Sequence, residues 1–204
     1  MKNRIYTGWY ENSITPDKKV KLAGQFYERV SQYVETDITC TALAVSSGTK
    51  HFIICSCDLV HIDDYLVDNV REKITGKCEG LDPFNVIINA THTHTSIDYQ
   101  RQENKYGSSL DILNEYMPED FSYIEKVKDD SIMQPEEAEE FLAERISDVI
   151  IKAWNNRTPS VYANAFGRAP VGMCRRAVYA DNTGLMWGDT SRDDFVSLEG
   201  GNDS

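Results

Sequence analysis

The chain has 204 residues, of which 41% are hydrophobic and 26% charged, and its formal net charge is −12. This composition is that of a soluble globular protein, and the negative charge argues against a nucleic-acid partner. No run of about 18 apolar residues occurs, so we expect no transmembrane segment. The first twelve residues lack the apolar core of a signal peptide. We therefore expect a soluble, cytoplasmic protein unless a signal segment has been removed, and the oligomeric state is left open.

The first predicted elements form a strand–helix–strand unit. Residues 38–46 and 50–59 are β-rich runs joined by a short loop that contains glycine, which predicts a β-hairpin. A helix is predicted from Asp63 or Asp64 to about Thr75, because apolar residues recur on one helical face. Residues 84–90 then form an apolar strand. We expect 50–59 and 84–90 to run parallel, with a right-handed crossover.

An acidic segment separates this unit from the rest of the chain. Residues 98–134 show no clear periodicity, and the stretch 98–145 carries −9 of the net charge of −12. We interpret 98–134 as a solvated acidic insertion, which follows the two histidines described below closely enough to cover them.

The remaining elements complete a prediction of the α/β class. A helix is predicted from Pro135 to about Trp154, a strand at 160–166, and a hairpin at 177–180 and 184–187. We expect a mixed β-sheet with flanking helices in a single α/β domain spanning 1–204. The chain ends in turn-forming residues after which another element is expected, so we interpret it as an incomplete, N-terminal part of a larger domain.

The chain has five cysteines, an odd number whose spacing fits neither a zinc knuckle nor a C-x-x-C redox pair. Cys55 and Cys57 alternate along a predicted strand, and we interpret them as small core residues rather than ligands.

Two of the four histidines, His92 and His94, follow directly after the predicted strand 84–90. At a spacing of two residues, side chains of an extended chain point to the same side. Ligand and metal sites of α/β sheets gather at the carboxyl ends of strands, and imidazole binds zinc well. The alternative is a polar strand end whose histidines bond to nearby backbone. The spacing alone leaves both readings open.

A carboxylate is expected near this pair. Asp58 ends the predicted strand 50–59, and if that strand lies beside 84–90, Asp58 reaches the histidines. A carboxylate that orients a metal-bound imidazole is a common supporting contact in metal sites. The alternative role for Asp58 is that of a loop or helix-capping residue. His61, three residues further on, is a weaker candidate for the same site.

Several stretches, in the same order, resemble the N-terminal part of the neutral/alkaline non-lysosomal ceramidase family. The most specific is ATHTHTS at 90–96, which resembles the family's A-T-H-T-H-S-G. The weaker ones are SITP at 13–16 with LAG at 22–24, the strand 52–59 ending in an aspartate and a leucine, and MCRR at 173–176. Together they span nearly the whole chain but about half of a family catalytic domain.

This resemblance implies a zinc-dependent hydrolase that cleaves the amide bond of N-acyl lipids, so the expected partner is a small lipid-like amide substrate. It implies that His92 is a zinc ligand, that His94 stabilises charge on the attacked amide, and that Arg175 is a further active-site cation. The family's other ligands and its serine motif are expected beyond Ser204. We therefore expect residues 1–204 alone to bind zinc incompletely or not at all.

The departures from the family pattern keep a second reading open. Residues 95–97 replace the family's S-G-P, and Cys174 replaces an asparagine. A serine motif, G-D-x-S, is superficially matched at 188–191, but a turn is the preferred reading there. The alternative is a non-catalytic or differently specific metal-hydrolase relative that lacks the full site. An amidohydrolase barrel is excluded because it needs eight β/α units. The actual substrate and its acyl specificity are left open.

Overall fold

The computed structural model describes residues 4–25, 28–100, 116, 131–168 and 174–200. The chain divides into two compact units, Met1–Val161 and Tyr162–Ser204, which are described separately below. The single domain expected over 1–204 stays a prediction. Most of the acidic insertion expected at 98–134 lies outside the described residues.

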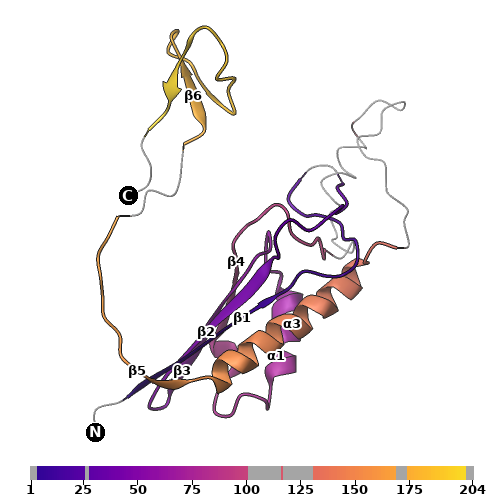
Figure 1. The fold of residues 1–204 in the computed structure, drawn as a ribbon, viewed down its shortest axis with the longest axis vertical. Coiled ribbons are helices and arrows are strands. Elements are labelled where there is room, and N and C mark those ends of the chain that lie inside the picture. Colours follow the sequence, from indigo (N-terminus) through magenta and orange to yellow (C-terminus); the bar gives the residue numbers. More distant parts are fainter. Residues whose placement is uncertain (1–3, 26–27, 101–115, 117–130, 169–173, 201–204) are drawn as a thin grey trace. The chain divides into compact units, whose positions relative to one another are not determined.

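The first unit contains a five-stranded sheet with strand order β4-β3-β2-β1-β5 (Figure 1). β3 and β4 run parallel, and the other neighbouring pairs are antiparallel. The predicted hairpin, the parallel pair and the mixed α/β class are confirmed. The strands are β1 (Ile5–Ser13), β2 (Thr39–Ser47), β3 (Lys50–Cys57), β4 (Val86–Ala90) and β5 (Thr158–Ser160).

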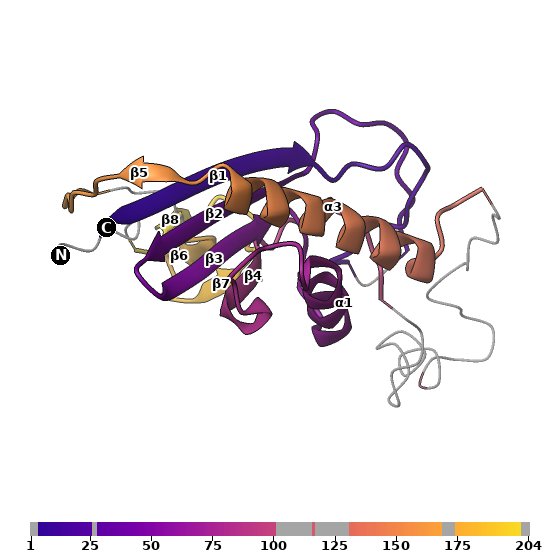
Figure 2. The ribbon, with the colours of Figure 1, turned by 90° about the horizontal axis from the view of Figure 1, so that it is seen from below.

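Two helices, α1 (Asp64–Ile74) and α3 (Pro135–Asn155), pack on one face of this sheet (Figure 2). Proline and two glutamates in the first turn of α3 suit a helix start, where the backbone N–H groups have no helical partner and the helix dipole favours negative charge. Both predicted helices are confirmed. β4 begins two residues later than expected, because Pro83–Asn85 form a 3₁₀ turn, η1, capped by the Asp82 side chain.

The core lies between the sheet and the two helices. Five of the six buried hydrophobic inward positions of β2 and β3 carry cysteine or alanine, small side chains that let the helices approach the sheet closely. Gly8 on β1 shows how close, because a Cβ there would lie 2.1 Å from the carbonyl oxygen of Ala153 in α3. The buried inward residues of the two central strands are Cys40, Ala42, Ala44, Ile53, Cys55 and Cys57.

The opposite face of the sheet carries a row of large apolar side chains. The strand register places Trp9 beside Leu43, Leu43 beside Ile54, and Ile54 beside Ile87. These four side chains are 58%, 40%, 42% and 58% exposed in that order. We call them the apolar row.

Some sequence predictions of strands were wrong. No strand runs over 160–166, because β5 is confined to Thr158–Ser160 and residues 161–168 form neither helix nor strand. β1 was not predicted, and neither was β8 (Phe195–Leu198).

The second unit is a three-stranded antiparallel sheet with order β7-β6-β8. Its hairpin of β6 (Arg176–Tyr179) and β7 (Gly184–Met186) confirms the prediction. The Asp181 carboxylate shapes the hairpin turn by accepting hydrogen bonds from the backbone and hydroxyl of Thr183. In the described part of both units, no helix is long and apolar enough to cross a membrane.

Candidate functional site

The imidazoles of His92 and His94 converge in the turn that follows β4. Their Nε2 atoms lie 3.3 Å apart, and the two rings are nearly perpendicular with centroids 4.8 Å apart. Both side chains are exposed. The fold therefore brings two imidazole nitrogens, each a possible metal ligand, together after the carboxyl end of β4, which runs parallel to β3.

The sequence predicted that the two side chains share a side because of strand alternation, but their convergence has another cause. β4 ends at Ala90, and His92 has a φ of 64°, in the left-handed region. Two backbone bonds still tie this turn to the segment after β3: the Thr91 N–H donates to the Cys57 carbonyl, and the His92 N–H to the Leu59 carbonyl, each at 2.9 Å. A non-glycine residue at positive φ costs of order 1–2 kcal/mol, so the surrounding contacts hold His92 in this conformation.

The hydrogen bonding of His92 fixes the tautomer of its ring. Nδ1 lies 2.7 Å from the carbonyl oxygen of Val60. A carbonyl can only accept, so Nδ1 carries the hydrogen and the lone pair of the neutral ring is on Nε2. Two nitrogens bound to one tetrahedral zinc at about 2.0–2.1 Å are roughly 3.3–3.4 Å apart. The Nε2–Nε2 distance of 3.3 Å fits that geometry, and it equally fits the hydrogen bond in which one imidazole N–H donates to the other ring.

Residues far away in sequence hold His94. A Cβ on Gly24 would lie 2.6 Å from Cγ of the His94 ring, so the backbone at Gly24 is in direct contact with that imidazole. The Arg29 guanidinium donates hydrogen bonds to the carbonyls of His94 and Ala23. Gly24 entered the sequence analysis only through the ceramidase resemblance. Arg29 carried no sequence signal, because its contact with His94 spans 65 positions.

Asp58 supports the turn rather than an imidazole. One carboxylate oxygen accepts from the backbone N–H and the hydroxyl of Thr39 at 2.9 and 3.1 Å, and the other accepts from the Thr91 hydroxyl at 3.0 Å. The contact expected from a carboxylate, at Nδ1 of His92, is made by the Val60 carbonyl. Asp58 therefore joins the start of β2 to the residue that precedes His92, and its role in orienting the metal site stays a prediction.

We expect Asp58→Asn to destabilise the fold by about 1–3 kcal/mol, because the single oxygen of the neutral amide can accept the two bonds from Thr39 but then leaves no acceptor for the Thr91 hydroxyl. We also expect it to weaken zinc binding by the histidine pair by about tenfold, since Thr91 loses its anchor. Chemical denaturation and a zinc titration followed by the histidine NMR signals measure the two effects. Asp82→Asn is the matched control, because Asp82 caps η1 and should change neither signal. Unchanged zinc affinity in Asp58→Asn would remove Asp58 from the site.

His61 belongs to a neighbouring cluster. Its ring stacks on Tyr99 with centroids 5.4 Å apart, and its Nε2 lies 3.2 Å from the Asp63 carboxylate. The Tyr99 hydroxyl donates to the His61 carbonyl and accepts from the Asp63 N–H. Burial raises the pKa of this hydroxyl, which keeps it a neutral donor. These contacts explain His61 as part of the packing at the entrance to α1.

A cavity of about 830 Å³ lies beside the histidine turn. Thr93 and Thr95, which flank His94, line it together with Asp58 and Arg29. The remaining wall is formed mainly by residues from 15–22 and 28–38, between β1 and β2. It includes the apolar side chains of Val20, Leu22, Val30, Val34, Ile38 and Ile97.

Arg175 lies in the second unit, just before β6. Its guanidinium stacks over the Trp187 ring, 4.0 Å from the centroid. Its neighbour Arg176 pairs instead with Glu199 at 2.8 Å. The two arginines thus have different partners, and the part that Arg175 takes in a catalytic site stays a prediction.

The serine at the superficial G-D-x-S match is part of a turn. The Ser191 hydroxyl and backbone N–H both donate to one carboxylate oxygen of Asp189, at 2.6 and 2.8 Å.

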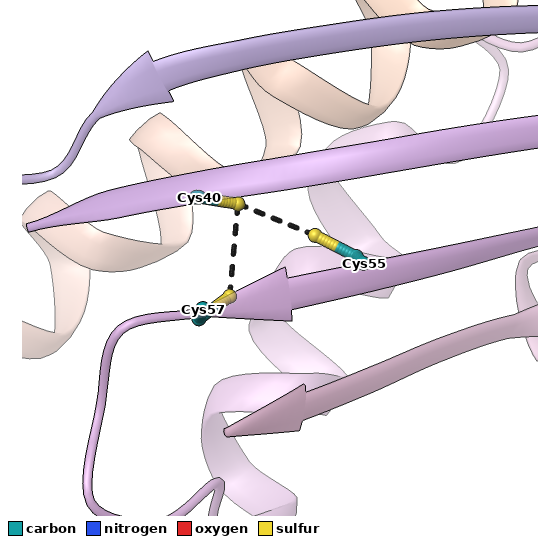
Figure 3. Close-up of side chains that lie close together, drawn as sticks. All are labelled: Cys40, Cys55 and Cys57. Carbon is teal, nitrogen blue, oxygen red and sulfur yellow. Dashed lines mark hydrogen bonds between the residues drawn. The ribbon is translucent and has the colours of Figure 1, made fainter. Parts of the chain in front are cut away.

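A second group of possible metal ligands lies in the core of the first unit. The sulfur of Cys40 is 3.3 Å from that of Cys55 and 3.6 Å from that of Cys57 (Figure 3). All three are buried, as the sequence predicted for Cys55 and Cys57. Within the described part of the chain, these thiols are the one group of three or more His, Cys, Asp or Glu ligands that could hold a metal ion. We call them the thiol cluster.

The contacts between the sulfur atoms shift the pKa of the three thiols in different directions. Hydrogen bonds from Cys55 and Cys57 lower the pKa of Cys40 to about 5. The same contacts with Cys40, together with burial, raise the pKa of Cys55 and of Cys57. Of the three thiols, Cys40 is therefore the one whose deprotonation the sulfur contacts favour.

Comparison with known proteins places the fold among ceramidase structures. No protein-family model matches the sequence, and no curated protein matches it. One similar structure is the neutral ceramidase from Pseudomonas aeruginosa, with a TM-score of 0.59, 17% identity, and coverage of 78% of this chain and 23% of that one. Another is a ceramidase complexed with C2, with a TM-score of 0.51, 15% identity, and coverage of 77% and 22%. The chain thus has the fold of a segment of these ceramidases and spans less than a quarter of their length.

Proposed function

We propose that this chain contributes part of the active site of a ceramidase-like, zinc-dependent hydrolase that cleaves the amide bond of N-acyl lipids. The observation that carries the proposal is the pair of imidazole Nε2 atoms 3.3 Å apart at the carboxyl end of β4. The likeness of the fold to neutral ceramidases supports the substrate class.

Zinc fits the donor that His92 offers, a neutral imidazole whose lone pair is on Nε2. When bound, zinc polarises a carbonyl oxygen and lowers the pKa of a bound water. Catalytic zinc sites generally use three protein ligands and keep one position open. His92 supplies one of those three, and no group of three His, Cys, Asp or Glu ligands in the described residues includes it. We propose that the missing ligands come from chain beyond Ser204.

The two histidines have separate tasks in this proposal. His92 is the metal ligand, because the Val60 carbonyl holds its Nδ1–H and leaves the lone pair on Nε2, on the side of the ring that faces His94. His94 faces the amide and donates a hydrogen bond to the oxygen on which negative charge develops. The contacts of Gly24 and Arg29 fix the position of His94, and Arg175 acts as a further active-site cation.

The cavity beside the histidine turn supports a lipid-like substrate. Its lining is mostly polar or charged, but apolar side chains such as Val20, Leu22 and Ile97 offer contacts to an alkyl chain, and Thr93, Thr95 and Arg29 offer polar groups beside His94.

The experiment that tests the proposal compares residues 1–204 with the protein extended along its own reading frame. We expect the extension to gain tight zinc binding and hydrolysis of a fluorescent N-acyl lipid together. In the extended protein, Arg175→Ala should lower hydrolysis by about 100-fold or more and leave zinc content unchanged, as expected for a cation that meets charge in the transition state. Arg176→Ala is the adjacent control, because its exposed pair with Glu199 contributes little.

Tight zinc binding without hydrolysis of any N-acyl lipid would favour the alternative of a differently specific hydrolase. An extended protein that binds no zinc would leave the non-catalytic alternative.

A further inference from the structure

The thiol cluster is built by the register of the β2–β3 hairpin. Cys40 lies directly opposite Cys57, and Cys55 is two residues before Cys57 on the same face of β3. The Asp58 N–H donates to the Thr39 carbonyl, so Thr39 and Asp58 form a hydrogen-bonded pair. The next pair, Cys40 and Cys57, is therefore a non-hydrogen-bonded one, in which opposing side chains come closest.

The sulfur spacing is close to that of ligands around a single ion. Two thiolates bound to one metal at about 2.3 Å are roughly 3.8–4.0 Å apart in tetrahedral or trigonal geometry. The sulfurs lie 3.3 and 3.6 Å from Cys40 and all within 4.8 Å of one another. Small side-chain rotations that move Cys40 away from its neighbours would open the triangle enough to admit an ion.

The surroundings select the kind of ion. All three side chains have no exposed surface, and Leu59, Leu66 and Ala42 are buried in the same core. Sulfur donors in an apolar pocket favour soft, thiophilic metals over Mg²⁺ or Ca²⁺, which need several oxygen ligands.

We propose that Cys40, Cys55 and Cys57 bind one thiophilic metal ion, Zn²⁺ or Cu⁺, at a site separate from the histidine pair. Each thiol that becomes a thiolate ligand releases one proton to solvent. With all three cysteines deprotonated, the loaded site has a net charge of −1 with Zn²⁺ and −2 with Cu⁺, so Zn²⁺ leaves the smaller charge buried in the core. Because the Cys57 carbonyl accepts from the Thr91 N–H, metal bound here would also stiffen the base of the histidine turn.

The experiment uses the reduced full chain carrying His92→Ala and His94→Ala, so that the histidine pair does not contribute. Cd²⁺ is titrated as a spectroscopic substitute for zinc, and Cu⁺ is titrated against a competing chelator. We expect one equivalent of Cd²⁺ or Cu⁺ to bind with a sulfur-to-metal charge-transfer band. Cys55→Ala should weaken this binding at least tenfold. Cys78→Ala, which removes another buried thiol, should not change it.

X-ray absorption of the zinc- or copper-loaded protein tests the site even if Cys55→Ala fails to fold. A shell of sulfur scatterers at about 2.3 Å is expected for zinc. If Cd²⁺ binds and Cu⁺ does not, the site is a zinc site. If Cu⁺ binds and Cd²⁺ does not, the site is a copper site. The proposal is overturned if neither ion gives a thiolate band, if the band persists in Cys55→Ala, or if the metal shell holds only nitrogen and oxygen. It is also overturned if the three cysteines bind no metal because Cys40 and Cys57 form a disulfide under reducing conditions.

Discussion

Replacing His92 with alanine is expected to abolish zinc binding by the histidine pair and to lower amide hydrolysis by the extended protein more than about 100-fold. Loss of a supporting contact alone costs 10- to 100-fold in metal sites, and this change removes a ligand. Only four histidines are present, so NMR signals of the imidazoles can follow zinc directly. The zinc-induced shift of His94 should disappear together with the activity.

Two further variants separate chemistry from folding. His51→Ala removes a histidine whose ring packs on Trp154, at the other end of β3, and should leave zinc binding intact. His92→Gly removes the ligand but relieves the cost of a φ of 64°, so it should bind no zinc and yet be about 1 kcal/mol more stable than His92→Ala. Hydrolysis that survives in both His92 variants would mean that the role carried over from the ceramidase family is wrong at its central residue.

A methyl group at Gly24 is expected to push the His94 imidazole out of position. The added Cβ would lie 2.6 Å from Cγ and 2.7 Å from Nδ1 of that ring, closer than nonbonded carbon atoms approach. We expect Gly24→Ala to lower hydrolysis by the extended protein about 100-fold, because displacements near 1 Å at a reacting group have effects of that size. The His94 NMR signals should shift, and those of His51 should not.

Gly76→Ala is a matched control for this change. Gly24 and Gly76 have similar positive φ angles, 90° and 76°, but nothing lies within 4 Å of a Cβ at Gly76. Both variants should lose about 1–2 kcal/mol of folding free energy from backbone strain, measured by denaturation. Only Gly24→Ala should also alter His94 and hydrolysis. Equal behaviour of the two variants would show that the contact with His94 has no functional role.

The sequence predicted the central part of the fold because its signals are local. The hairpin, α1 and β4 each have their own periodicity and turn residues, and the crossover rule then makes β3 and β4 parallel. β1 was missed because its outward positions mix Trp9 with polar residues and its centre contains Gly8, so no alternating pattern stands out. β5 and β8 have three and four residues, too few for a periodic signal.

The candidate site was predictable in its residues but not in its geometry. The His-x-His spacing identified the pair, while the left-handed backbone at His92 depends on hydrogen bonds with Leu59 and Val60. The thiol cluster required the register of the hairpin, which places Cys40 opposite Cys57. The contacts of Gly24 and Arg29 with His94 depend on tertiary packing, which residue types and spacings do not encode.

The apolar row has a consequence for the behaviour of this chain in solution. Salts such as ammonium sulfate raise the cost of exposed apolar surface, and four large side chains aligned across four strands concentrate that surface in one place. The solubility of the chain should therefore fall at lower ammonium sulfate concentrations than its net charge of −12 alone would suggest. Leu43→Thr, which puts a β-branched residue suited to a strand at the centre of the row and adds a hydroxyl, should counter salting-out.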